Sequence, residues 1–127
     1  MASTLFEKLW QRHVVADLGD GFHLMLVGRH LLNDMGGRAF ITLDRRDLRL
    51  AHPELTFATM DHTVATLTTA DPQSGEAANP YVVNLREAAK RHGFRLFDLG
   101  QPEFGIIHVI AAERTGADPS RSVGRLR

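Results

Sequence analysis

The 127-residue sequence contains no cysteine. This absence excludes disulfides, thiolate metal sites and an iron–sulfur cluster held by the chain's own thiolates. The sequence also lacks any apolar run that approaches the ~20 residues needed to span a bilayer. Its first four residues, MAST, form neither a basic region nor an apolar signal core, so the cytoplasm is the expected compartment.

Net charge is the second missing feature. Fifteen Lys and Arg residues balance fifteen Asp and Glu residues, so no broad electrostatic field directs the chain to nucleic acid or to a membrane. Arginines do outnumber acids near the C-terminus, at positions 114, 121, 125 and 127. Residues 114–127 are therefore interpreted as a polar tail, either solvated or acting as a binding arm. Residues 1–113 are long enough for one domain, and the chain is 43% hydrophobic, which supplies a core.

The first half of the chain is predicted to alternate between helix and strand. A capping-box pattern at Thr4 and Glu7 predicts a helix over residues 4–13, and residues 19–21 (GDG) form a turn signal. The apolar run 22–27 (FHLMLV) predicts a core strand, with Arg29 and His30 following at its end. Residues 39–43 then predict a short helix.

The second half repeats the alternation. A turn at His52-Pro53 leads into a strand near residues 55–58, which residues 63–69 can extend, and residues 70–79 have the composition of a surface loop. Asn79, Pro80 and Gly93 are the cap, the first residue and the stop of the clearest helix. A strand within residues 94–99 follows, whereas residues 106–110 fit a helix or a strand equally. This order predicts an α/β fold with a small, mostly parallel sheet flanked by helices.

Asp61 and His62 follow directly after the predicted strand at residues 55–58. In α/β proteins the carboxyl ends of strands border the crevice that binds ligands. A carboxylate beside an imidazole can fix its tautomer and favour its charged form, which makes a proton donor or acceptor near neutral pH. The alternative interpretation is an Asp-His dipeptide in a solvated turn.

Several segments, in the same order and with similar spacing, resemble the large subunit of isopropylmalate isomerase (3-isopropylmalate dehydratase) and, more distantly, aconitase. They are residues 4–10 (TLFEKLW) with 13–15 (HVV), 29–31 (RHL), 56–64 (TFATMDHTV), 93–99 (GFRLFDL) and 105–109 (GIIHV). The resemblance covers roughly residues 4–113. It implies a truncated aconitase-like domain.

The resemblance also implies roles for individual residues. By position, Asp61 and His62 resemble the acid pair that protonates a leaving hydroxyl, and His108 resembles a further active-site histidine. For His108, a buried structural histidine is the other interpretation. Candidates to bind a substrate carboxylate, each with a structural alternative, are Arg29, His30 and Arg38.

The sequence departs from the family pattern in two places. A His-Glu-Val-Thr-Ser-Pro-like segment is replaced by Asn33, Asp34 and a shortened Gly36-Gly37-Arg38, and a Gly-Pro-Glu segment is replaced by residues 111–113 (AAE). Family members also use an iron–sulfur cluster and a serine base from a distant domain. Expelling hydroxide without a Lewis acid is hard, so the classical isomerase activity is not expected of this chain alone.

Three functional hypotheses remain. The first is a stand-alone, cluster-free lyase- or isomerase-type enzyme acting on a small carboxylate, with no cofactor; a single metal held by His62, His108 and either His30 or Asp61 is a variant of it. The second is a non-catalytic ligand-binding or partner-subunit domain. The third is a piece of a larger enzyme with no separate role. In each case, surfaces that are covered in the longer family members are expected to pair in a homodimer or with a companion subunit.

Overall fold

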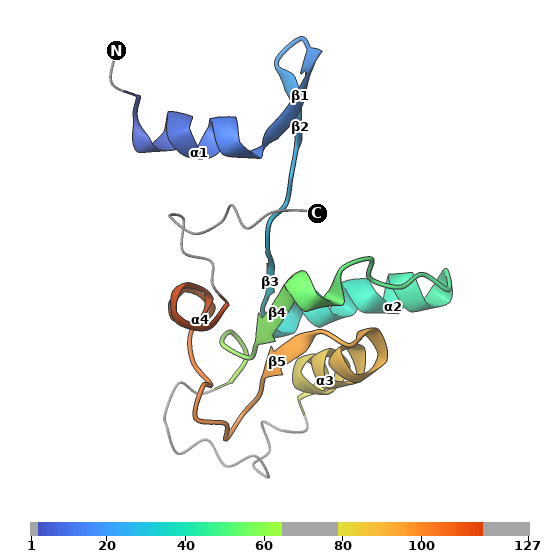
Figure 1. Ribbon diagram of the computed structural model, residues 1–127. Coiled ribbons are helices and arrows are strands. Elements are labelled where there is room, and N and C mark those ends of the chain that lie inside the picture. The colour runs from blue at the N-terminus through green and yellow to red at the C-terminus, as the bar shows by residue number, and fades with distance from the viewer. Residues whose placement is uncertain (1–2, 65–78, 116–127) are drawn as a thin grey trace.

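The computed structural model describes residues 3–64 and 79–115. Figure 1 shows an arm that stands away from a body built on a small sheet. The arm contains α1 (Leu5–His13), β1 (Val14–Gly19) and β2 (Phe22–Met25). The body contains β3 (His30–Leu32), the 3₁₀ turn η1 (Asp34–Gly36), α2 (Gly37–Arg45), the 3₁₀ turn η2 (Pro53–Leu55), β4 (Thr56–Thr59), α3 (Pro80–His92), β5 (Arg95–Phe97) and α4 (Ile107–Arg114). No helix in these two ranges is long and apolar enough to cross a bilayer.

The sheet of the body is parallel, with the strand order β3-β4-β5. In its register, Leu32 lies beside Ala58, and Ala58 lies beside Leu96. Helices α2 and α3 lie on one side of the sheet and α4 lies on the other (Figure 1). The predicted α/β class with a small parallel sheet flanked by helices is therefore confirmed. Because the strands are parallel, the residues that follow β3 and β4 meet at one edge of the sheet.

The main core fills the space between the sheet and the helices α2 and α3. Its buried members are Phe40, Ala58, Met60, Val82, Leu85, Ala88, Phe94 and Leu99. Glycine at position 37 allows the two helices to approach closely, since a Cβ there would lie 3.0 Å from the backbone nitrogen of Leu85. This packing holds the start of α2, and the η1 turn before it, against the sheet.

Helix α3 forms as its capping signals predict. The Asn79 side chain accepts a hydrogen bond from the backbone N–H of Tyr81, and Pro80 occupies the first turn. Gly93 ends the helix with φ 78°, in the left-handed region that glycine tolerates best. On the face of α3 toward the core, Val82, Leu85 and Ala88 are buried, and Ala89 is partly buried.

The arm corrects one prediction. Helix α1 begins with the predicted capping box, in which Thr4 and Glu7 bond reciprocally. Residues 22–27, however, do not form a core strand: β2 pairs antiparallel with β1 in a hairpin, and most of its side chains are exposed. The prediction was wrong because an apolar run of strand length does not reveal what will cover it.

Four further predictions concern residues 63–79 and the C-terminal part of the chain. The ambiguous run at 106–110 is helical, as the start of α4. Residues 63 and 64 do not continue β4. The predicted strand extension at 65–69, the loop at 70–78 and the tail from 116 onward lie outside the described residues, while residue 114 ends α4.

Candidate functional site

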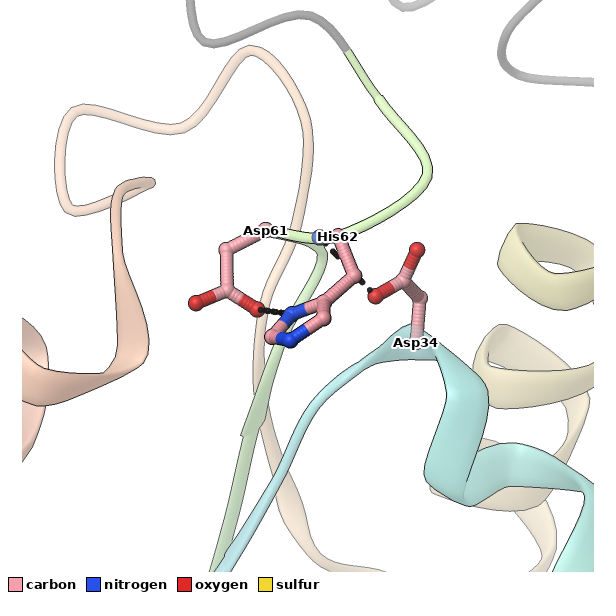
Figure 2. Close-up of side chains that lie close together, drawn as sticks. All are labelled: Asp34, Asp61 and His62. Atoms are coloured by element: carbon pink, nitrogen blue, oxygen red, sulfur yellow. Dashed lines mark hydrogen bonds and ion pairs between the residues drawn. The ribbon is translucent and has the colours of Figure 1, made fainter.

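The candidate site lies where two neighbouring parallel strands end. Asp61 and His62 come after β4, and Asp34 comes after β3 as the first residue of η1. Figure 2 shows the three side chains close together, with the His62 ring turned toward Asp61. The site therefore sits at the edge of the sheet where an α/β fold places ligand-binding residues.

The Asp61 carboxylate and the His62 imidazole form a direct pair. Oδ1 of Asp61 lies 2.8 Å from Nδ1 of His62. A carboxylate only accepts, so it selects the form of the ring that carries a proton on Nδ1. The Asp61 side chain is 4% exposed, whereas that of His62 is 48% exposed. The pair thus joins a sheltered carboxylate to a half-exposed ring whose Nε2 is not bonded to the carboxylate.

Electrostatics favour the charged form of His62. The hydrogen bond to Asp61 has the largest effect and raises the pKa of the imidazole above its ordinary value of 6.5. Desolvation opposes it, and the negative charges of Asp61 and Asp34 add smaller effects that raise the pKa. At a given pH the ring is therefore protonated more often than a free imidazole, and its proton can be donated.

The second oxygen of Asp61 caps a helix. Oδ2 accepts a hydrogen bond of 2.8 Å from the backbone N–H of Ile107, the first residue of α4. The residue before it, Ile106, supplies no capping side chain. Asp61 therefore fills the role of the missing cap, and the partial positive charge of the helix terminus stabilises its negative charge.

Asp34 binds the backbone of the two residues that follow Asp61. Its side chain is completely buried, and it accepts hydrogen bonds from the backbone N–H groups of His62 (3.1 Å) and Thr63 (2.7 Å). The Thr63 hydroxyl also donates to it, in a short contact. Asp34 was absent from the predicted site; its only signal in the sequence is an acidic residue directly after the strand beside β4.

Asn33 was also absent from the predicted site, and its side chain faces Nε2 of His62. Its Oδ1 accepts a hydrogen bond from the Gly36 N–H (3.2 Å), which orients the amide so that Nδ2 lies 3.4 Å from Nε2 of His62. When the ring is neutral, Asn33 can donate to Nε2. When the ring is charged, both groups are donors and the contact is lost, which exposes the proton.

Of the predicted site residues, the structure brings together only Asp61 and His62. His108 follows Ile107 on α4, but its side chain is exposed. Arg38, in the first turn of α2, extends over the Tyr81 ring at 5.8 Å, at the same edge of the sheet as Asp34. The catalytic role of His108 and the carboxylate-binding role of Arg38 stay predictions.

Arg29 and His30 lie at the opposite edge. They were expected to follow a strand, but His30 begins β3 and pairs with Thr56 at the start of β4. The Arg29 guanidinium donates to the carbonyl oxygens of Thr115 (3.2 Å) and Gly28 (2.7 Å), so it ties the end of α4 to the strand. Their role in substrate binding stays a prediction.

The three acidic and imidazole groups could in principle hold a metal ion. One ligand atom from each of Asp34, Asp61 and His62 lies within 4.8 Å of the others. The same atoms already accept or share the hydrogen bonds described above. A carboxylate oxygen that accepts one hydrogen bond keeps a lone pair, so an ion could bind the two carboxylates without breaking these bonds.

Comparisons with known proteins agree on one family. The model of the aconitase family (aconitate hydratase) matches residues 7–124. The chain is 43% identical over 113 residues to 3-isopropylmalate dehydratase large subunit 1 of Bradyrhizobium diazoefficiens, covering 87% of the chain and 23% of the relative. Large subunits from Staphylococcus haemolyticus and Natronomonas pharaonis are 34% and 36% identical, covering 97% and 94% of the chain and 27% and 26% of the relatives.

The matches also show how much of each relative the chain covers. The chain spans about a quarter of the length of the curated relatives it matches. No solved structure matches it.

Proposed function

Because the chain belongs to the aconitase family, we propose that Asp61 and His62 perform lyase- or isomerase-type acid–base chemistry on a small carboxylate. The observation that carries this proposal is the 2.8 Å contact between a sheltered carboxylate and an exposed imidazole at the carboxyl edge of the sheet. The raised pKa of His62 suits a proton donor near neutral pH.

In this proposal Asp61 is the positioning residue and His62 is the catalytic acid. Asp61 holds the proton on Nδ1, so the second proton of the charged ring lies on Nε2. That proton passes to the leaving oxygen of the substrate as the carbon–oxygen bond breaks, and the bonding electrons leave with the oxygen. An acceptor must take the carbon-bound proton. In the isolated chain this acceptor is a water molecule, and we propose that a companion chain supplies a stronger base, since the relatives are named as large subunits.

The iron–sulfur cluster that the family resemblance implies does not fit this chain's own residues. Such clusters are held by cysteine thiolates, and the 127 residues include none. No step of the proposal passes through a cluster. We propose a substrate whose leaving group needs only a proton, and Arg38, at the same edge of the sheet, as the residue that binds its carboxylate.

A second function is favoured by the same hydrogen bonds. Both oxygens of Asp61 and both of Asp34 accept hydrogen bonds. Those of Asp34 join η1 to the backbone after β4, and Oδ2 of Asp61 joins that segment to α4. A site built in this way can serve as a structural clasp in a non-catalytic ligand-binding or partner-subunit domain. The two proposals differ in the role of the His62 ring. The clasp uses only its Nδ1 hydrogen bond, whereas catalysis also requires Nε2.

The experiment is proton NMR of a panel of hydroxy- and unsaturated diacids in heavy water with the purified, metal-analysed chain. Catalysis predicts deuterium at a carbon position or a new product, lost in His62→Gln. A matched control is His52→Gln, which removes an exposed histidine that also contacts a carboxylate, Glu54 (3.1 Å). Unchanged activity in His62→Gln would refute the role of His62 as the acid. No reaction across a panel that the folded chain nevertheless binds would favour the clasp.

A further inference from the structure

A hollow lies on the face of the sheet that carries α4. In the sheet register, Phe57 of β4 lies beside Arg95 of β5, and the next pair along is Ala58 and Leu96. Successive side chains of a strand point to opposite faces. Ala58 and Leu96 pack in the core with α2 and α3. Phe57, Arg95 and Phe97 therefore point to the opposite face, which α4 partly covers (Figure 1).

The hollow is formed where this cover ends. Helix α4 packs mainly on β3 and β4, which leaves the adjoining face of β5 open. The hollow measures about 380 Å³, and its lining residues are Phe57, Arg95, Phe97, Glu103 and Arg114. None of them belongs to the candidate site. Ligand pockets range from about 300 to 1,000 Å³, so the hollow has the volume of a small-ligand site.

The side chains that line the hollow combine aromatic rings with positive charge. The Arg95 guanidinium lies over the Phe97 ring, 5.2 Å from its centroid, and a guanidinium in this position keeps N–H donors at its edge. Within residues 3–64 and 79–115, no carboxylate pairs with Arg95 or Arg114, and both are exposed. Two guanidinium groups and the carboxylate of Glu103 leave one positive charge in the hollow.

From these observations we propose that the hollow binds a small aromatic monocarboxylate. The Phe57 ring contacts the ring of the ligand, and Arg95 and Arg114 bind its carboxylate in charge-assisted hydrogen bonds. An apolar occupant would bury two guanidinium groups without an anion, which costs free energy. This binding site does not depend on the proposed acid–base chemistry, so either proposal can fail while the other stands.

Nitrogen-15 NMR of the full chain, titrated with sodium benzoate, tests the proposal. The dissociation constant of benzoate is expected on the order of 1 mM, given its few non-hydrogen atoms. The largest shifts are expected at Phe57, Arg95 and Arg114. Benzamide, which lacks the charge, and acetate, which lacks the ring, are each expected to bind at least ~10-fold more weakly.

Substitutions separate the hollow from the candidate site. Arg95→Gln and Arg114→Gln are each expected to weaken benzoate binding about 3- to 10-fold. Glu103→Gln is expected to strengthen it about 2- to 5-fold, because a negative charge leaves the lining. The matched control is Arg38→Gln, which removes another arginine that lies over a ring, that of Tyr81. It should leave the dissociation constant of benzoate unchanged.

Several results would overturn the proposal. One is a titration that does not saturate up to about 20 mM benzoate, and another is an affinity for benzamide or acetate equal to that for benzoate. A third is a set of shifts centred on His62 that Arg38→Gln removes, because the carboxylate would then bind in the candidate site. If an arginine variant does not fold, as judged by circular dichroism, nuclear Overhauser contacts between benzoate and the Phe57 ring of wild type replace it. These contacts are expected, and their absence would contradict the proposal.

Discussion

Replacing Asp61 with asparagine separates the electrostatic role of the pair from its shape. In wild type, Oδ1 meets the His62 ring and Oδ2 accepts the Ile107 N–H, each at 2.8 Å. The asparagine amide has one accepting oxygen. The backbone N–H can only donate, so it should keep that oxygen, and the amide NH₂ should turn toward Nδ1 of His62. The ring must then accept at Nδ1 and carry its proton on Nε2.

Two consequences of Asp61→Asn can be measured. The pKa of His62 should fall toward 6.5, since the carboxylate that raises it is gone, and nitrogen-15 NMR should show the neutral proton moving from Nδ1 to Nε2. Loss of a charged acceptor should lower the free energy of unfolding by about 1.5–3 kcal/mol. Any acid-catalysed turnover should fall by about 10²–10⁴-fold.

The control for this substitution is Glu54→Gln, which removes the carboxylate from an exposed histidine pair outside the site. It should leave the His62 titration unchanged. The reasoning is refuted if Asp61→Asn leaves both the pKa and the tautomer of His62 as in wild type, because the carboxylate would then not control the ring.

Other substitutions test neighbouring parts of the account. His62 has a raised folded pKa, so its stabilisation should be complete below pH 6.5 and lost as the pH rises through the folded pKa; the gap in urea stability between wild type and His62→Gln should shrink over that range. Asp34→Ala removes a fully buried acceptor of three hydrogen bonds and should cost about 3–5 kcal/mol in urea denaturation. Gly37→Ala should cost about 1–3 kcal/mol, because the new Cβ meets the Leu85 backbone at 3.0 Å; Gly28→Ala, with its nearest atom at 3.7 Å, should be near neutral in the same assay.

Local signals in the sequence predicted the elements that depend on local chemistry. The capping box at Thr4 and Glu7 and the cap, proline and glycine of α3 are confirmed because each satisfies backbone groups within a few residues. The placement of the Asp61–His62 pair after a strand is also confirmed, since it needs only the end of one apolar run.

Features that depend on distant partners could not be predicted in this way. Arg29 and His30 were assigned to the carboxyl end of a strand because residues 22–27 were taken as that strand; the strand in fact starts at His30, which reverses the edge on which both residues lie. Asp34 could not be identified because a buried acid and an acid in a solvated loop give the same signal in the sequence. Its hydrogen bonds with the backbone of His62 and Thr63 exist only in the folded chain.

The central claim is that His62, held by Asp61, donates the proton that drives turnover. The most direct test is the pH dependence of the reaction found in the diacid panel, compared with the nitrogen-15 titration of His62 in the same sample. The account predicts that the rate falls as the pH rises through the pKa of His62, above 6.5, and that Asp61→Asn moves both midpoints down together. A rate that stays constant while His62 titrates would contradict it.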